Sequence, residues 1–354
     1  MGKAFGEDNR RSTRVCLEDD GIVSTESQRV EEVRPPLARH LLRGLIHRTR
    51  RNWARELWDW ARCGQLNLPT VRELTSSFEA LDNSDQGDEY GDSEAPIFLL
   101  ATGWRSGSTL LQRIMVTDPS VLLWGEPLGE MALLPQIAGM LAKLSPSTDL
   151  LRPNERQEAV FSSLATSWIA TLYPPGTDFR RGLRALLIEW LCVPAQRRGF
   201  SRWGFKEVRL GALEATLLHW AFPRAKFILL SRNPYDCYRS LADSGWHHLY
   251  HSRPDVRVDS AAGIARHWNR TALSWGDLPE SFPVFRVKYE DLIARKVNFR
   301  ALESWLGVKL NEDVALSAKV GGTARRRRLG LCERWIISHE AKAGMLALGY
   351  SEPT

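Results

Sequence analysis

The chain has few cysteines and no long apolar run. Its 354 residues include five cysteines, which are scattered, odd in number and form no Cys-x-x-Cys pair. This arrangement argues against a disulfide framework or a zinc site and favours a reducing compartment. The first residues are charged and lack the apolar core of a signal peptide, and no stretch approaches the roughly 20 apolar residues of a membrane span. We therefore expect a soluble, cytoplasmic protein.

The charge of the chain is also only moderately unbalanced. A formal net charge of +6 suits an anionic ligand, but it does not by itself indicate nucleic acid. Nucleic-acid binding would further require basic and aromatic residues interleaved on one face, or a known binding fold, and the sequence shows neither. With 43% hydrophobic residues, the chain has ample material for one large α/β domain.

Three regions differ in composition. Residues 1–36 are polar and end in two prolines, which predicts a disordered arm. Residues 37–63 place tryptophans and leucines at helical intervals opposite several arginines, which predicts a basic amphipathic helix. This helix either docks on the main domain or makes peripheral contact with a membrane surface. Residues 73–94 carry eight carboxylates and no lysine or arginine, which is typical of a solvated linker. We accordingly divide the chain into 1–36, 37–93 and a main domain, 94–354.

The main domain alternates between apolar strands and helical patterns. The segments "IFLLAT", "KFILLS" (226–231) and "VFRVKYEDL" (284–292) predict strands, and a helical pattern follows each of them. Strands without polar alternation favour a parallel sheet that is covered on both faces. We expect a three-layer, P-loop-like α/β fold with a central parallel sheet and an N-terminal helical extension. Ligands then bind at the carboxyl ends of the strands.

The segment "ATGWRSGSTLL", residues 101–111, has the outline of a phosphate-binding loop. Glycines at two positions permit unusual backbone angles, and the amides at the start of the following helix point toward a ligand. The predicted anion site contains Arg105, Ser106, Gly107, Ser108 and Thr109. The loop lacks the Gly-Lys-Ser/Thr of a nucleotide triphosphatase, which disfavours a kinase that uses ATP.

A second loop, "LLSRNPYDCYRS", also follows a predicted strand. Arg232 comes directly after the strand, Pro234 suits the first turn of a helix, and Ser240 lies on that helix. Arg232 and Ser240 therefore form a second candidate anion site near the first. Together the two loops suggest one ligand with two separate phosphate-like groups.

These motifs resemble those of sulfotransferases that depend on 3′-phosphoadenosine 5′-phosphosulfate. "TGWRSGSTLL" is similar to the family's 5′-phosphosulfate loop, and "AKFILLSRNPYDCYRSL" is similar to its 3′-phosphate motif. "WGFKEVRL", "FRVKYEDL" and "ESWLGV" follow the family's order, and "LALGY" resembles its end more weakly. The resemblance covers residues 95–310 and lies nearer the carbohydrate, protein-tyrosine and bacterial branches than the cytosolic phenol and steroid branch.

The resemblance implies a role for each matching residue. Arg105 and the amides of residues 106–109 would hold the 5′-phosphosulfate, and Arg232 and Ser240 would hold the 3′-phosphate. Lys206 would be a second catalytic cation, and Tyr289 corresponds to a tyrosine that contacts the cofactor in some members. A late basic loop closes over the 3′-phosphate in many members, and Arg325 or Arg326 would then lie there; the alternative is a solvated basic loop. The implied reaction needs no metal.

The general base has two candidates. Glu126 in "LLWGEPLGE" matches a glutamate of the tyrosine-sulfating and bacterial members, although Pro127 replaces a second glutamate and the spacing is one residue longer. Glu130 is the alternative on the same segment. Histidine is the base in the phenol-sulfating branch, but His247, His248 and His251 do not match its position and are better assigned to an acceptor cleft or the surface.

The sequence thus predicts sulfuryl transfer to a hydroxyl or amine of a sugar, glycolipid or secondary metabolite. Two alternatives remain: an ATP-dependent kinase, and a non-catalytic protein that binds nucleotides or a membrane surface. The acceptor and the oligomeric state stay open.

Overall fold

The computed structural model describes residues 69–82, 94–127, 132–144, 161–167, 169, 174, 176–244, 260–313 and 328–351. The predicted arm (1–36) and the predicted basic helix (37–63) lie outside these residues, and so does the N-terminal extension that the helix was expected to form. No helix among the described residues is long and apolar enough to cross a membrane.

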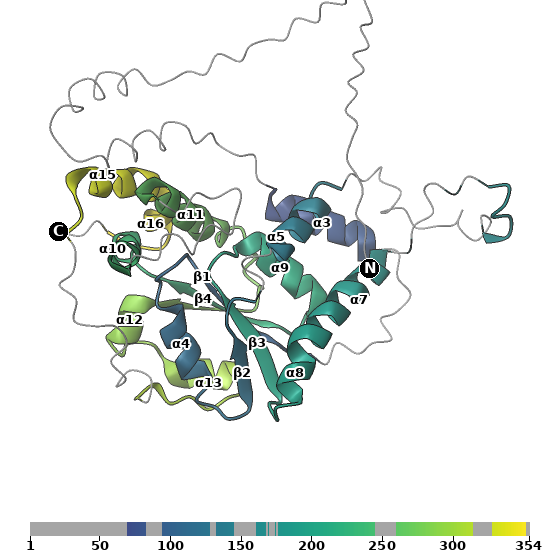
Figure 1. Ribbon diagram of the computed structural model, residues 1–354, viewed down its shortest axis with the longest axis horizontal. Helices are drawn as coiled ribbons and strands as arrows, with labels where there is room; N and C mark the ends of the chain where they lie inside the picture. The colour runs from purple at the N-terminus through teal and green to yellow at the C-terminus, as the bar shows by residue number, and fades with distance from the viewer. Residues whose placement is uncertain are drawn as a thin grey trace, which may run out of the picture. The chain divides into compact units, whose positions relative to one another are not determined.

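A five-stranded parallel sheet forms the centre of the described fold, with the strand order β2-β3-β1-β4-β5 (Figure 1). The strands are β1 (Ile97–Ala101), β2 (Val121–Trp124), β3 (Arg202–Glu207), β4 (Lys226–Ser231) and β5 (Val284–Lys288). All five residues of β1 are buried, as expected for the middle strand of a sheet that is covered on both faces.

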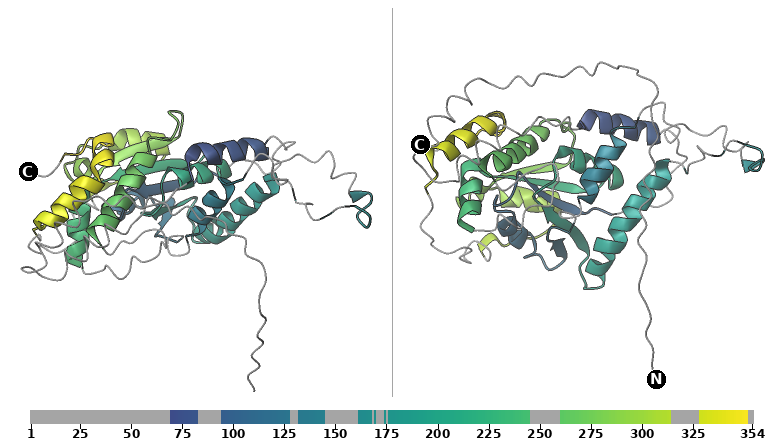
Figure 2. Two further views of the ribbon diagram at one scale, coloured as in Figure 1. Left: turned by 90° about the horizontal axis from the view of Figure 1, so that it is seen from above. Right: turned by 45° about the horizontal axis from the view of Figure 1, so that its top comes forward.

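Helices cover both faces of this sheet and form the two outer layers (Figures 1 and 2). They are α3 (Val71–Asp82), α4 (Ser108–Met115), α5 (Leu133–Leu141), α7 (Gly176–Leu187), the π-helical turn η2 (Ile188–Cys192), α8 (Val193–Gln196), α9 (Ala212–Ala221), α10 (Pro234–Ser244), α11 (Ala261–Ser274), α12 (Tyr289–Ile293), α13 (Phe299–Leu306), α15 (Leu331–Glu340) and α16 (Lys342–Ala347).

The alternation of side chains along β1 divides the core in two. Leu99 and its same-face neighbours pack with residues of α4, α10, α11, α13, α15 and α16. Phe98 and Leu100 point to the opposite face and pack with residues of α3, α5, α7 and α9. Successive side chains of a strand point to opposite faces, so each strand contributes to both cores. The three-layer α/β fold with a central parallel sheet is confirmed.

The linker predicted for residues 73–94 is wrong over its first part, because residues 71–82 form helix α3. Thr70 and Glu73 form a capping box: the amide of Thr70 donates to Oε2 of Glu73 at 2.7 Å, and the amide of Glu73 donates to Oγ1 of Thr70 at 3.2 Å. The buried face of the helix includes Leu74 and Phe78, and the Phe78 ring stacks on that of Trp220 at 4.3 Å. Glu73 and Glu79 are exposed on the other face of the helix, which explains why the number of carboxylates alone predicted a linker.

The strand predicted for residues 284–292 is too long by four residues. β5 ends at Lys288, and Tyr289–Ile293 form the short helix α12. Glu290 and Asp291 lie in the first turn of α12, where negative side chains interact favourably with the helix dipole. This early helix start places Tyr289 at the carboxyl edge of the sheet.

The strand order determines which loops meet at that edge. β1 lies between β3 and β4, so the segments that follow these three strands are neighbours. Each of them carries charged residues from the predicted motifs: residues 102–107 after β1, residues 208–211 after β3 and residues 232–233 after β4. In parallel α/β sheets this edge is where ligands bind.

Candidate active site

The loop between β1 and α4 turns sharply before the helix begins. Arg105 has a φ of 61° and Gly107 a φ of 89°, both in the left-handed region. A Cβ added at Gly107 would lie 2.2 Å from Cδ2 of Tyr289, so only glycine lets the loop approach this ring. Ser108 is the first residue of α4, and the first amides of a helix have no partner within it. The loop therefore presents backbone donors and the positive end of a helix dipole at one place.

The loop between β4 and α10 lies directly against the first loop. Nε of Arg105 donates a hydrogen bond to Oγ of Ser240 on α10 at 3.1 Å. Nη1 of Arg232 donates to the carbonyl oxygen of Arg105 at 2.7 Å. The Arg232 guanidinium also lies 4.2 Å from the centroid of the Tyr289 ring, a cation–π contact. The sequence prediction that the two loops meet is confirmed by these contacts.

Several polar atoms at this meeting point are buried without a hydrogen-bond partner within the described part of the chain. They are Oγ of Ser106, Oγ1 of Thr102 and Nε of Arg232. A buried donor without an acceptor costs free energy, on the order of 1–3 kcal/mol. An anionic ligand offers acceptors to donors of this kind, so these residues fit a phosphate- or sulfate-bearing ligand. Among the described residues, no group of three or more His, Cys, Asp or Glu side chains is arranged to hold a metal.

A hydrogen-bond network holds the second loop in place. The amide of Asn233 donates to Oε1 of Glu290 at 2.9 Å, and the hydroxyl of Tyr350 donates to Oε2 of the same carboxylate at 3.1 Å. Ser231 and Tyr350 share a further hydrogen bond of 2.9 Å. Burial raises the pKa of the Tyr350 phenol above its usual range. The segment that ends in Tyr350 therefore supports the loop after β4 through neutral and charged hydrogen bonds.

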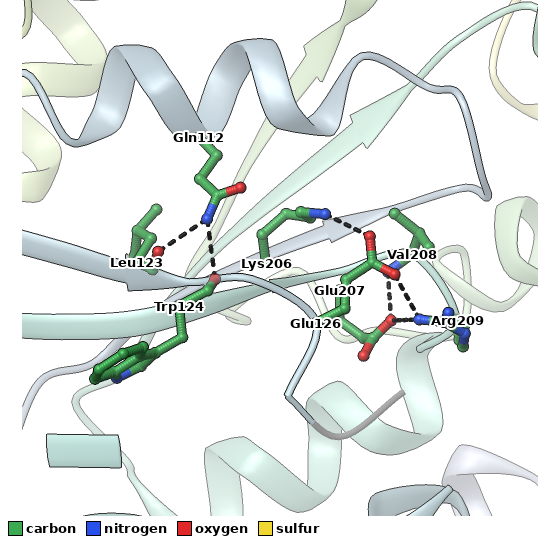
Figure 3. A network of polar contacts seen from close by, with 8 residues as sticks. All are labelled: Gln112, Leu123, Trp124, Glu126, Lys206, Glu207, Val208 and Arg209. Carbon is green, nitrogen blue, oxygen red and sulfur yellow. Dashed lines mark hydrogen bonds and ion pairs between the residues drawn. The ribbon is translucent and has the colours of Figure 1, made fainter. Parts of the chain in front are cut away.

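Four charged side chains gather next to the first loop, after β2 and along the end of β3 (Figure 3). Nζ of Lys206 pairs with Oε1 of Glu126. Nη1 of Arg209 lies 2.6 Å from Oε2 of Glu126 and 2.8 Å from Oε1 of Glu207. Glu207 is fully buried, whereas the Glu126 side chain is 27% exposed. Glu126 is thus the carboxylate of this group that is open to a ligand.

The surroundings of Glu207 and Arg209 shift the pKa of both side chains. Burial raises the pKa of the Glu207 carboxyl, and the nearby Glu126 adds to this rise against the opposing effect of Arg209. Burial alone lowers the pKa of the Arg209 guanidinium, but Glu207 and Glu126 raise it above its usual range. Arg209 is therefore a firmly charged cation between two carboxylates.

Arg209 also contacts the first loop. Its guanidinium lies 5.6 Å from the centroid of the Trp104 ring, and this ring lies 4.8 Å from the imidazole of His267. His267 is buried, and its Nε2 shares a hydrogen bond of 3.1 Å with the carbonyl oxygen of Val208. The tryptophan of the loop is thus packed between residues that also fix the segment after β3.

Three hydrogen bonds hold Glu126 close to Lys206. Nε2 of Gln112 on α4 donates to the carbonyl oxygens of Leu123 at 2.8 Å and of Trp124 at 3.1 Å, which fastens α4 to the end of β2 (Figure 3). The amide of Lys206 donates to the carbonyl oxygen of Gly125 at 3.2 Å. The residue after Gly125 consequently lies beside the end of β3.

The structure brings most of the predicted site residues to one edge of the sheet. Arg105, Ser106, Gly107, Ser108, Arg232, Ser240 and Tyr289 line the two loops, and Lys206 pairs with Glu126 beside them. Thr109 is exposed at the start of α4. The remaining predicted residues, Glu130, His247, His248, His251, Arg325 and Arg326, lie outside the described residues.

Two residues of the site, Glu207 and Arg209, were not among those predicted. Both belong to "WGFKEVRL", in which only the lysine was singled out. A signal was present, because a carboxylate and a guanidinium follow an apolar strand at the ligand edge. Glu126 lies 83 residues away from Arg209 along the chain, so their pairing could not be read from spacing.

Fold and site together define a P-loop-like α/β protein with two adjoining candidate anion-binding loops and a carboxylate–lysine pair next to them. The profile of the sulfotransferase family matches residues 96–312, which is more than half of the chain. The chain therefore belongs to the sulfotransferase family, whose members transfer sulfuryl groups.

Solved structures of sulfotransferases are similar to this chain at low identity. The sulfotransferase domain from the curacin biosynthetic pathway is 19% identical, with a TM-score of 0.41 over 73% of this chain and 99% of that one. The sulfotransferase domain of the olefin synthase from Synechococcus PCC 7002 is 21% identical, with a TM-score of 0.37 over 76% of this chain and 100% of that one. A sulfotransferase from Alicyclobacillus acidocaldarius is 14% identical, with a TM-score of 0.37 over 72% and 94%. No curated protein matches the sequence.

Proposed function

We propose that the protein transfers a sulfuryl group from 3′-phosphoadenosine 5′-phosphosulfate to a hydroxyl or amine of a small-molecule or glycan acceptor. The observation that carries this proposal is the direct contact between the two anion-binding loops. Arg105 reaches Ser240 at 3.1 Å, and Arg232 reaches the Arg105 carbonyl at 2.7 Å. Two cationic loops that are joined in this way suit a single ligand with two anionic groups.

Each half of the site has a natural part of the donor to hold. Arg105 and the amides of residues 106–109 suit the 5′-phosphosulfate, because a helix start and a guanidinium both favour negative charge. Arg232 and Ser240 suit the 3′-phosphate, and the ring face of Tyr289 keeps the Arg232 guanidinium in place. The donor supplies an activated sulfuryl group whose leaving group is a phosphate.

Glu126 and Lys206 are placed for the chemical step. The acceptor oxygen forms a bond to sulfur while the bond from sulfur to the phosphate oxygen breaks and its electron pair passes to that oxygen. The acceptor proton passes to a carboxylate oxygen of Glu126, which acts as general base. Lys206 and Arg105 stabilise the negative charge on the phosphate oxygen, a role that metal ions share in kinases.

A thermal-shift comparison tests the donor. We expect 3′-phosphoadenosine 5′-phosphate without magnesium to raise the melting temperature by about 5 °C at saturation, because a ligand that binds only the folded state stabilises it. Mg-ATP should produce a much smaller shift. The reverse order would overturn the sulfotransferase proposal and favour the kinase alternative.

The acceptor and the compartment belong to the same proposal. We assign the acceptor to a sugar, a glycolipid or a secondary metabolite, not to nucleic acid, and we place the enzyme in the cytoplasm, in line with the free thiols of Cys192, Cys237 and Cys332. Incubation of acceptor pools with sulfur-labelled donor, followed by mass identification of the labelled product, tests this assignment. Glu126→Gln should abolish labelling while the donor still binds.

A further inference from the structure

The four charged residues beside the first loop differ in how firmly they are held. Glu207 is fully buried, and its Oε1 accepts hydrogen bonds from the Val208 amide at 2.9 Å and from Nη1 of Arg209 at 2.8 Å. Arg209 is 5% exposed and also lies over the Trp104 ring. A guanidinium that leaves this position abandons a buried carboxylate, which is strongly unfavourable. Arg209 is therefore a fixed partner of Glu126.

Lys206 holds Glu126 in a different way. Lys206 is as buried as Arg209, but its ammonium stands on a flexible stem and pairs with one carboxylate, at Oε1 of Glu126. Arg209 pairs with two carboxylates, with Oε2 of Glu126 and with Glu207 (Figure 3). The two oxygens of Glu126 thus have separate partners. The proposed reaction needs both members of the Lys206–Oε1 pair separately. Lys206 stabilises the phosphate oxygen of the donor, and Oε1 of Glu126 accepts the proton of the acceptor.

We propose that Arg209, anchored by Glu207, is a positioning residue that keeps the Glu126 carboxylate oriented through Oε2 after Lys206 leaves Oε1 for the sulfuryl donor. This inference rests on the proposed function. Before the donor binds, Lys206 occupies the oxygen that acts as the base. When Lys206 turns to the donor, Oε1 becomes free for the acceptor, and Arg209 remains as the cation beside the carboxylate. Within the described part of the chain, the charged groups in contact with Glu126 are Lys206 and Arg209, with Glu207 behind Arg209.

Binding of 3′-phosphoadenosine 5′-phosphate tests this role without an acceptor. We would titrate the full chain and its variants with this ligand by calorimetry and compare the dissociation constants. Without Arg209, Lys206 can turn to the ligand only by leaving the Glu126 carboxylate with no cation beside it, which is unfavourable. We expect Arg209→Met to weaken binding about fivefold.

Matched variants connect this loss of affinity to Glu126. Arg209→Met combined with Glu126→Gln should bind as tightly as Glu126→Gln alone, and Arg209→Lys, which retains a charge, should lose little affinity. A purely structural role for Arg209 would weaken binding in both backgrounds. Equal affinity of the unchanged chain and Arg209→Met, or a loss that persists in the Glu126→Gln background, would overturn the proposal.

Folding must not obscure the result. If Arg209→Met does not fold because Glu207 is left without its partner, Glu207→Leu with Arg209→Met removes both charges together. Its comparison with Glu207→Gln, which retains Arg209, then replaces the comparison above.

A second measurement examines the lysine. Glu126→Gln should tighten binding of 3′-phosphoadenosine 5′-phosphate about fivefold, because Lys206 no longer has to leave an ion pair. The same substitution in a Lys206→Met background should have little effect, whereas simple charge repulsion would act in both backgrounds. Unchanged or weaker binding in Glu126→Gln would contradict the transfer of Lys206. Absence of any binding by the unchanged chain would instead refute the proposed function, so the two failures are distinguishable.

Discussion

At the scale of single residues, Gly107 shows how closely the two sides of the site approach each other. Its φ is 89°, and a Cβ at this position would lie 2.2 Å from the Tyr289 ring, which leaves no room for a side chain. We expect Gly107→Ala to displace Tyr289 or the loop and to weaken binding of 3′-phosphoadenosine 5′-phosphate at least about tenfold, with a loss of about 1–3 kcal/mol in the free energy of unfolding. Calorimetric titration and urea unfolding measure the two effects.

Gly182 offers a matched control for this substitution. It lies in α7, and a Cβ added there has no neighbour within 4 Å. Gly182→Ala should leave ligand binding unchanged and raise stability by up to about 1 kcal/mol, since alanine favours a helix more than glycine does. Equal ligand affinity in the two variants would show that the contact of Gly107 with Tyr289 does not matter for binding.

Buried thiols give the protein a pH dependence on the alkaline side. Burial raises the pKa of Cys237 from 9.0 to about 12. The unfolded chain then releases the thiol proton at lower pH than the folded one, so the stabilisation is complete below about pH 9 and is lost as the pH rises toward 12. Between pH 8 and pH 10 this thiol should cost the folded state about 1.4 kcal/mol.

The variant Cys237→Ala isolates this contribution. Between pH 8 and pH 10, the free energy of unfolding of Cys237→Ala in urea should fall by about 1.4 kcal/mol less than that of the unchanged chain. Other titrating groups, among them Cys192 with its pKa raised by burial to about 12, act in both proteins and cancel in the difference. An identical pH slope in the two proteins would contradict the prediction.

Some site residues are predictable from sequence because local rules place them. Arg105 and Ser240 each stand in a segment where a strand gives way to a helix, and parallel strands bring such segments to one edge. Their contact at 3.1 Å follows from this rule together with the adjacency of β1 and β4. No local rule predicts Arg209 as a site residue. Its place in the site depends on ion pairs with the buried Glu207 and with Glu126, which follows a different strand.

At the scale of elements, the apolar strands were predictable and helix α3 was not. Uninterrupted apolar runs such as "KFILLS" mark strands that are buried on both faces, and β4 has the predicted bounds. For α3, the count of carboxylates hid the apolar positions 71, 74, 78 and 81, whose spacing is that of one helix face. The Thr-x-x-Glu capping box before this pattern was the signal that would have identified the helix.

The contribution of α3 to the core can be measured by removing one ring. Phe78 is 5% exposed and stacks on Trp220 with an interplanar angle of 2°. We expect Phe78→Ala to lower the free energy of unfolding by about 3–5 kcal/mol, as is typical for truncating a buried aromatic residue. Ser76→Ala on the exposed face of the same helix should change it by less than about 0.5 kcal/mol. If both variants unfold at the same urea concentration, α3 does not belong to the core.

At the scale of the whole molecule, the strand order is what assembles the site, and the sequence does not specify it. β3 is third along the chain but lies between β1 and β2 in the sheet. This insertion puts Lys206 beside the end of β2, where its amide bonds to the Gly125 carbonyl, and so pairs it with Glu126. Motif order alone leaves open which loops are neighbours, because connections between parallel strands can pass over either face and skip positions.

The boundary of the folded unit is a property of the same scale. Composition predicted a main domain that starts at residue 94, yet α3 lies before that point and packs in the same core as α5, α7 and α9. Residues Arg50–Thr354 group into one compact unit by their contacts. We therefore expect a chain truncated to 50–354 to unfold cooperatively and to bind 3′-phosphoadenosine 5′-phosphate with an affinity within about twofold of that of the full chain.

A chain truncated to 94–354 should behave differently, because it exposes the apolar surface that α3 covers. The loss of four buried apolar side chains, Val71, Leu74, Phe78 and Leu81, removes roughly 1.5–3 kcal/mol for each, which is comparable to the whole stability of a domain. We expect this chain to aggregate or to show no cooperative melting transition, as followed by circular dichroism and light scattering. Equal melting temperatures for 50–354 and 94–354 would show that the folded domain begins at residue 94 and that α3 does not contribute to its stability.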